Sequence, residues 1–320
     1  MIDDIFYLLI SLLFLTTITY GIGLVFSFIL KINNQAIFTN LSVGLVGIVV
    51  FISLYKTSLN SINIIFLFVA GLFAFLRRKQ SFNKVNYSFE LKELLKVFFV
   101  TTFVFGYHFC EIYNFKSLSE IQPVHWDFIS YFQNSLSLNS SGNENTLGLV
   151  NNFYPDIFSY STPYHYMEIW LNVFFVSVLK INGFKCLLFI TYTILNSTCV
   201  LGIISLLDLI LNKKLNFFIA FVFAFILSFL EPIYFSFYEN YEILKYNDGI
   251  CNTSFFGHGK KYSTTYIFSI FFVRFFIKKN MHAPLYFVPL ISIGSFGGVY
   301  FFCVIKVIKD KLRNKKTSLI

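Results

Sequence analysis

Residues 185–211 have the sequence KCLLFITYTILNSTCVLGIISLLDLIL, and Lys213-Lys214 follows almost at once. The segment is nearly continuously apolar and exceeds the roughly 20 residues that an α-helix needs to cross the hydrocarbon core of a bilayer. A pair of lysines directly after such a segment is typical of the cytoplasmic end of a membrane span. This stretch therefore predicts a transmembrane helix.

Apolar segments of similar character recur through the 320 residues of the chain. Hydrophobic residues make up 56% of the sequence, the mean hydropathy is +0.68, and only 13% of the residues are charged. Soluble domains carry about 25% charged residues, roughly twice that share. The sequence therefore predicts an all-α fold, a polytopic transmembrane helical bundle of about eight spans in the cell (inner) membrane. The predicted spans are residues 5–30, 36–55, 59–76, 94–113, 185–211, 216–235, 263–277 and 284–308.

Basic residues follow the apolar segments in short clusters, and they account for the net charge of +9. Clusters of this kind fix the orientation of spans and contact anionic lipid headgroups. Membrane lipids rather than nucleic acid are therefore the expected partners. The clusters are Arg77 to Lys79, Lys92 with Lys96, Lys213-Lys214, Lys278-Lys279 and Lys306 to Lys316.

The cysteines and histidines are scattered along the chain rather than clustered. None of the five cysteines forms a CxxC pair or another spacing typical of metal ligands. They are expected to be small packing residues in or beside apolar segments. The spacing therefore predicts no disulfide framework and no zinc site.

One long polar loop, residues 114–165, interrupts the apolar pattern. It contains Asp127, carries a single lysine, Lys116, and has no arginine. A long loop poor in lysine and arginine between spans is typical of the outer face of a membrane. The basic connector at residues 77–96 is then cytoplasmic, and the three spans before it place the N-terminus outside.

Two segments allow two interpretations each. The clean apolar part of residues 164–181 is short, and runs of about 10–14 apolar residues are more often interfacial than spanning. An interfacial segment also places Lys213-Lys214 and Lys278-Lys279 inside, so this interpretation is favoured over a span. Residues 284–308 form either one span or a short hairpin that bends at its glycines, and both interpretations stay open.

Residues 124–138, within the polar loop, have the spacing of an amphipathic helix. An amphipathic helix can lie on the membrane surface with its apolar face down, which would place Asp127 at the level of the headgroups. A carboxylate there can act as a general base on a hydroxyl group. The alternative is a solvated polar face without a catalytic role. The predicted apolar face carries Phe128, Phe132 and Leu136, and the opposite face carries Asp127, Tyr131 and Asn134.

The end of this loop offers a second pair of polar side chains. His165 and Glu168 lie about one helical turn apart, so they can line one cavity. The alternative is that both simply face water.

A second predicted outer loop, residues 231–261, is rich in tyrosines beside carboxylates, among them Tyr238 and Glu239. Tyrosine rings can stack on sugars, and carboxylates can hold sugar hydroxyls. Lys260 and Lys261 follow a glycine and can hold a phosphate by charge. The alternative for these residues is ordinary loop chemistry and a basic patch that faces lipid.

The order of these features resembles the GT-C superfamily of membrane glycosyltransferases, the group of the protein O-mannosyltransferases and the lipid A aminoarabinose transferase. The resemblance covers about residues 95–305 and divides the chain into an N-terminal three-span block, residues 1–80, and a GT-C-like transmembrane core, residues 81–320. Three extra spans precede the match and the chain ends sooner than most members, so a short or truncated form is expected. The matching residues are Asp127, Tyr131, Gly142, Pro163, Tyr164, His165, Lys213-Lys214 and Pro232.

The resemblance implies that a sugar moves from a polyprenyl-phosphate-linked donor to an acceptor glycan, lipid or protein on the outer face. Asp127 then matches the loop aspartate that acts in the family as a base or as the ligand of a divalent metal ion. Lys260 or Lys261 is expected to contact the carrier phosphate. The remaining expected substrate-binding residues are Tyr131, His165, Glu168, Tyr238 and Glu239.

Two non-glycosyltransferase classes remain as alternatives. A transporter or flippase is expected to carry ionisable residues or broken helices near the bilayer midplane. Here the charges within spans are few: Asp208 is near the end of its span, and Arg274 is close to the basic pair that follows. A polysaccharide polymerase is expected to carry arginines in its outer loops, and both predicted outer loops lack arginine.

Overall fold

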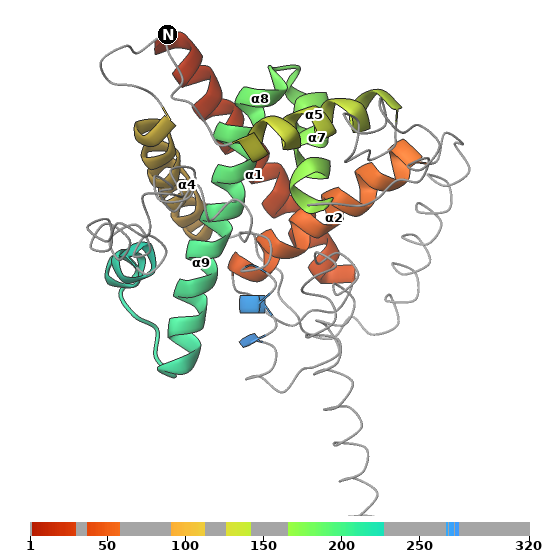
Figure 1. The fold of residues 1–320 in the computed structure, drawn as a ribbon. Coiled ribbons are helices and arrows are strands. Elements are labelled where there is room, and N and C mark those ends of the chain that lie inside the picture. The colour runs from red at the N-terminus through yellow and green to blue at the C-terminus, as the bar shows by residue number, and fades with distance from the viewer. Residues whose placement is uncertain are drawn as a thin grey trace, which may run out of the picture.

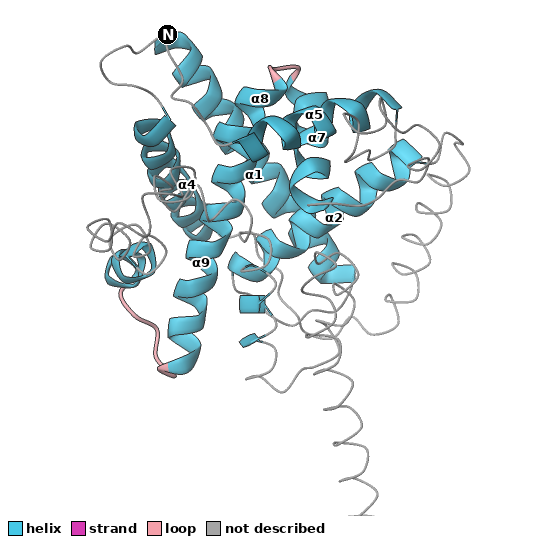
Figure 2. Ribbon diagram, in the orientation of Figure 1, coloured by secondary structure: helices cyan, strands magenta, loops and turns pink. Residues whose placement is uncertain are grey.

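The computed structural model describes residues 2–29, 37–57, 91–112, 126–141 and 166–226, together with most of residues 267–274. Within these ranges every regular element is helical (Figure 2), which confirms the predicted all-α class. The elements are α1 (Ile2–Ile29), α2 (Ile37–Thr57), α4 (Leu91–Ile112), α5 (Trp126–Ser141), α7 (Tyr166–Leu179), α8 (Gly183–Cys186), the π-helical turn η2 (Leu187–Thr191), α9 (Tyr192–Ile210) and a further helix, residues 217–226.

α8, η2 and α9 follow one another without a break and form the central helix of the described structure (Figure 1). Asn182 begins it, because its Oδ1 accepts hydrogen bonds from the backbone N–H groups of Phe184 and Lys185, at 2.9 and 3.2 Å. Asn212 follows its end with a left-handed φ of 50°, a common way for asparagine to stop a helix. The other helices pack around this apolar helix, so it is almost entirely buried.

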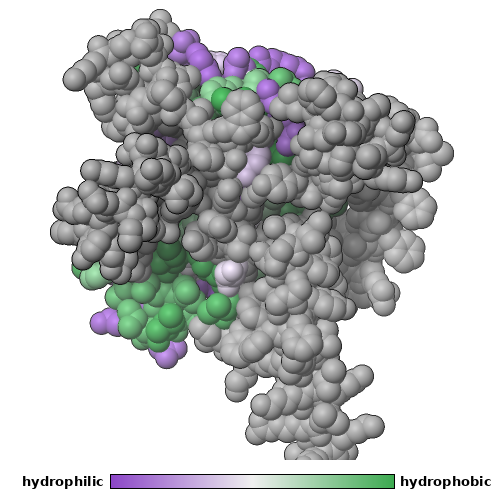
Figure 3. Space-filling model, in the orientation of Figure 1, coloured by the Kyte–Doolittle hydropathy of each residue, from purple (hydrophilic) through white to green (hydrophobic). Residues whose placement is uncertain are grey.

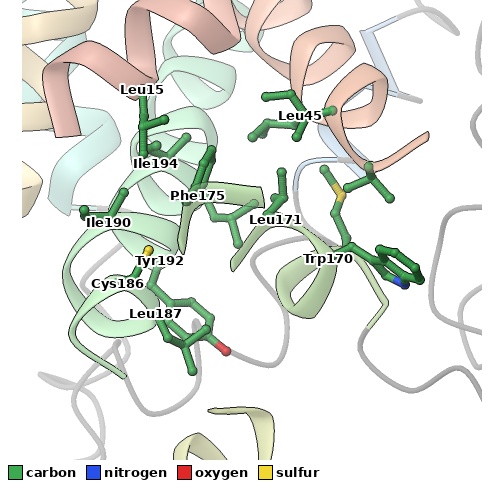
Figure 4. Packing of buried hydrophobic residues seen from close by; sticks show 14 of the residues in the cluster. Leu15, Leu45, Trp170, Leu171, Phe175, Cys186, Leu187, Ile190, Tyr192 and Ile194 are labelled. Carbon is green, nitrogen blue, oxygen red and sulfur yellow. The ribbon is translucent and has the colours of Figure 1, made fainter. Parts of the chain in front are cut away.

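The core lies where α1, α2 and α7 meet the first half of the central helix. Figure 4 shows side chains from all four converging, among them Leu15, Leu45, Phe175 and Ile194, and each of these four is at most 1% exposed. α1 and α2 therefore share one core with the rest of the described chain. The domain boundary predicted near residue 80 lies outside the described residues.

α1 and α2 cross at van der Waals contact between their backbones. A Cβ atom added at Gly23 would overlap the carbonyl oxygen of Asn40, and one added at Gly44 would overlap that of Thr19. Two helices can approach this closely only where small residues face each other, which is a common way to pack helices in membranes. The pairing of Thr19 with Gly44 and of Gly23 with Asn40 also shows that the two helices run antiparallel.

The bundle has two chemically different ends. α4 runs antiparallel to α9. His108 near the end of α4 contacts Asn196 near the start of α9. Lys96 near the start of α4 lies 5.7 Å from the ring centre of Phe217, which follows the end of α9. We call the latter end, with Lys92, Lys96, Lys213 and Lys214, the basic end. The opposite end holds the start of α1 beside α8, where Asp4 lies 3.8 Å from Lys185, and α5 packs on α7 and α8 there.

Two described helices, Asp4–Ser27 and Gly183–Ile210, are long and apolar enough to cross a membrane. They correspond to two of the eight predicted spans. Shorter apolar helices are Ile37–Ile52, Met167–Leu179 and Phe217–Ile226. The spans predicted at 59–76 and 284–308, with both interpretations of the latter, lie outside the described residues.

α7 occupies the segment predicted to be interfacial. With 14 residues, it is shorter than the roughly 20 residues that span a bilayer. It does not lie on the surface, however, because every residue from Met167 to Val173 is buried. α2 and α5 pack against α7, so the protein itself covers this short apolar helix.

Candidate functional site

The predicted site residues are only partly described by the structure. Asp127 is the second residue of α5. Tyr131 of α5 and Glu168 of α7 are both buried, at 1% exposed each, and their helices pack against each other. The structure thus brings Tyr131 and Glu168 into one part of the bundle. The other predicted residues, His165, Tyr238, Glu239, Lys260 and Lys261, lie outside the described residues.

The predicted orientation of α5 is wrong. Tyr131 and Asn134, on the face predicted to be solvated, are buried, whereas Leu136 of the predicted apolar face is 47% exposed. Phe128 is buried as well, and its ring lies edge-on to that of Tyr192 at 5.4 Å. The physical reason is that α5 packs on α7 and α8, so polar groups on its inner face meet protein rather than water.

Asn172 of α7 connects three elements in the interior. Its Nδ2 donates to Ser135 Oγ of α5 at 3.0 Å and to the carbonyl oxygen of Gly183 in α8 at 3.3 Å. Its Oδ1 accepts a hydrogen bond from Thr191 Oγ1 of η2 at 3.3 Å. An amide has two N–H donors and one carbonyl acceptor, so this side chain uses all its polar atoms to join α5, α7 and the central helix.

His108 of α4 makes a second set of buried contacts with the central helix. Its Nε2 lies 3.1 Å from Asn196 Nδ2, and its Nδ1 lies 3.0 Å from Thr193 Oγ1. Because an amide nitrogen can only donate, Nε2 accepts from Asn196, and the proton is on Nδ1, which donates to Thr193. The contacts therefore assign one neutral tautomer to a fully buried imidazole.

The π-helical turn lies between these two sets of contacts. Thr191 is its last residue, and Thr193 and Asn196 follow within the next turn and a half. π-helical turns are rare and frequently occur at functional sites. We call Ser135, Asn172, Thr191, Thr193, Asn196 and His108 the interior polar cluster.

The interior polar cluster offers amides, hydroxyls and an imidazole. Among the described residues, no three His, Cys, Asp or Glu side chains come together as a metal site would require. The Oδ1 atom of Asn196 is buried and has no hydrogen-bond partner within the described part of the chain. The cluster can therefore join helices and can accept one further hydrogen bond at Asn196 Oδ1.

Sequence analysis missed His108, Asn172 and Asn196 as a group. Each lies within an apolar segment, where a polar side chain is expensive unless it has a partner and is a functional candidate by default. That signal was available in the sequence. The partners of these side chains could not be found in the sequence, because they lie far away along the chain. His108 and Asn196, for example, are more than 80 residues apart.

A separate polar group lies near the basic end. Arg274 Nη1 donates to the carbonyl oxygen of Ser205 at 2.9 Å, and Arg274 also interacts electrostatically with Asp208. Asp208 Oδ1 accepts from the backbone N–H of Leu215 at 2.9 Å. The two charges predicted near the ends of their spans thus lie close enough to attract each other.

No protein-family model, curated protein or solved structure matches this chain.

Proposed function

We propose that this chain is an integral membrane protein whose basic end faces the cytoplasm and whose α5 end faces the outside. Cytoplasmic ends of spans carry the excess of lysines, and Lys92, Lys96, Lys213 and Lys214 share one end of the bundle, against Lys180 and Lys185 at the other. The start of α1, with Asp4, lies at the other end beside Lys185. This arrangement agrees with an outer N-terminus and an outer α5.

We further propose that the protein is a glycosyltransferase. It would move a sugar from a polyprenyl-phosphate-linked donor to an acceptor hydroxyl on the outer face. Asp127 would remove the hydroxyl proton while the hydroxyl oxygen attacks the anomeric carbon of the sugar. The bond to the carrier then breaks, and polyprenyl phosphate leaves with the bonding electrons.

The observation that carries this proposal is the fixed position of α5. The helix that begins with Trp126-Asp127 is attached to α7 through Ser135 and Asn172, at the end of the bundle opposite the basic end. A base must be held within a narrow range of positions to act. A helix anchored by buried contacts supplies such support, which a free loop does not.

The test is Asp127→Asn in vesicles supplied with a radiolabelled polyprenyl-phosphate sugar and an acceptor extract. Transfer should fall at least 100-fold, the lower range for loss of a general base, while the amount of inserted protein stays unchanged. Asp4→Asn is the matched control, because it removes an exposed carboxylate at the same end, and it should transfer normally. Equal transfer by Asp127→Asn and Asp4→Asn would contradict the catalytic role.

A transporter or flippase is the second candidate, and the interior polar cluster favours it. Buried polar side chains beside a distorted helix are expected in proteins that move polar cargo through a membrane. On this alternative the cluster, rather than Asp127, is the functional site.

The same vesicles separate the two candidates. A flippase moves labelled lipid-linked sugar across the vesicle membrane without any acceptor, keeps this activity in Asp127→Asn and loses it in Asn196→Leu. A glycosyltransferase shows no movement that depends on the protein, and its labelled product appears only when an acceptor is present.

A further inference from the structure

An exposed aromatic surface lies between α4 and the 217–226 helix. The ring of Phe99 lies 5.5 Å from that of Phe218 and 5.0 Å from that of Phe221, and the ring of Phe103 lies 4.9 Å from that of Phe225. Phe99, Phe103 and Phe218 remain 38%, 47% and 62% exposed, whereas Phe225 is half-buried and Phe221 lies buried beneath them. We call these five phenylalanines the phenyl surface.

The phenyl surface ends at the turn between α9 and the 217–226 helix, which carries Lys213 and Lys214. Both lysines are exposed, and neither forms an ion pair within the described residues. Figure 3 shows an apolar area in the region where α9 and the 217–226 helix lie in Figure 1, with hydrophilic atoms at its lower edge. The surface is therefore apolar along its length and cationic at one end.

The turn is held in place by its own hydrogen bonds. Asp208 Oδ1 accepts from the backbone N–H of Leu215 at 2.9 Å, and Asn216 Oδ1 accepts from that of Phe218 at 3.0 Å. Asp208 also interacts with Arg274, so this carboxylate is already engaged. Glu93, the acid at the start of α4, pairs with Lys96 at 2.6 Å. Within the part of the chain that the structure describes, the acids nearby are thus engaged, which leaves Lys213 and Lys214 available to an anion.

The charge and shape of this region select a lipid over a protein partner. From Phe218 to Phe225 the helix rises about 10 Å, long enough to lie along a good part of an acyl chain. Helices that bind another membrane helix expose small residues for close approach, whereas this surface exposes bulky rings. Each lysine near a membrane surface favours an anionic headgroup.

We propose that an anionic phospholipid of the cytoplasmic leaflet binds here, with its headgroup phosphate on Lys213 and Lys214 and an acyl chain along the phenyl surface. This inference rests on the proposed orientation in the membrane. It does not depend on the glycosyltransferase or flippase activity, because its test measures lipid binding alone.

The experiment measures how much phosphatidylglycerol stays bound to the purified full chain, by native mass spectrometry from mixed phosphatidylglycerol and phosphatidylcholine micelles. Lys213→Gln combined with Lys214→Gln should weaken phosphatidylglycerol binding about tenfold, since each lysine contributes to headgroup attraction. Lys180→Gln combined with Lys185→Gln, at the opposite end, removes the same charge and should leave binding unchanged. An equal loss of phosphatidylglycerol binding in both double variants would mean that the net charge of the protein alone attracts the lipid, and it would contradict the proposed site.

A second pair of variants tests the acyl chain. Phe218→Ala should weaken binding several-fold, whereas Phe223→Ala, which is 58% exposed on the same helix but belongs to no ring pair with α4 among the described residues, should not. Unchanged binding in Phe218→Ala would reduce the site to a headgroup contact and contradict the proposal. Inorganic phosphate should neither bind nor compete, because it lacks the chain, and competition by phosphate would also overturn it. Unaltered gel-filtration profiles confirm that each variant is folded.

Discussion

The Nε2 atom of His108 lies 3.1 Å from the amide nitrogen of Asn196, so a residue near the end of α4 is joined to the central helix one turn after its π-helical segment. The contact is fully buried. His108 and Asn196 are 0% and 1% exposed. A buried polar atom that loses a hydrogen-bond partner is destabilising, which makes this pair a sensitive place to test the packing of the bundle.

Asn196→Leu should lower the free energy of unfolding by about 1–3 kcal/mol, because the Nε2 acceptor of His108 would lose its donor in the protein interior. The measurement is thermal unfolding of the purified protein in detergent. Thr198→Val is the matched control, because among the described residues Thr198 Oγ1 bonds only to a carbonyl of its own helix, that of Ile194 at 2.7 Å. An effect of Thr198→Val as large as that of Asn196→Leu would contradict a specific role for the contact with His108.

Gly23→Ala should destabilise the protein by about 1–3 kcal/mol, the usual effect of adding a methyl group where none fits. The new Cβ would overlap the backbone of Asn40, and backbone cannot rotate away as a side chain can. Gly21→Ala, two residues earlier in α1, meets nothing within 4 Å and should be neutral or slightly stabilising, because alanine favours helix. Thermal unfolding of both variants measures the difference, and equal stability would mean that α1 and α2 do not cross at Gly23.

Asn172→Leu should release α5 from α7, because it removes the donor to Ser135 and the acceptor of Thr191. We expect amide hydrogen exchange in α5 to rise about tenfold, in line with the loss of a buried hydrogen bond. The second half of α9 should exchange as before. Ser140→Ala is the control, because Ser140 is exposed and bonds only within α5, to the carbonyl oxygen of Ser137 at 3.0 Å. Uniformly faster exchange in both helices would indicate general unfolding instead.

The two ends of the bundle should react from opposite sides of the membrane. In a variant whose native cysteines are replaced, Gln133→Cys, exposed on α5, should react with an impermeant maleimide in intact cells. Lys213→Cys should react only after the membrane is opened. The reason is that lysines at span ends stay cytoplasmic. Labelling of both positions from the same side would exclude the proposed orientation.

The helices themselves could be predicted from the sequence with fair accuracy. The segment 185–211 is the central helix of the structure, and the amphipathic pattern at 124–138 became α5, Trp126–Ser141. The short segment after the polar loop became α7, which is shorter than a span, but it is buried in the bundle rather than interfacial. These results depend on hydropathy and on the 3.6-residue period, both of which are local properties of the chain.

The contacts of those helices could not be predicted in the same way. The period of α5 predicted the helix but assigned Tyr131, Asn134 and Leu136 to the wrong environments, because amphipathicity does not say whether a polar face meets water or polar groups of other helices. Asn172 supplies such groups in the interior, and it comes from another helix.

The sequence by itself determined that the chain is helical and apolar, where its longest helices lie, and that its lysines follow the apolar segments. Only the tertiary structure decided that Gly23 and Gly44 form a close backbone crossing, that His108 meets Asn196, and that Asn172 joins α5 to the central helix. The physical reason is the distance along the chain over which each effect acts. Helix formation and hydropathy are set by neighbours within a few turns, whereas each of these contacts joins residues from different helices and depends on the geometry of their packing.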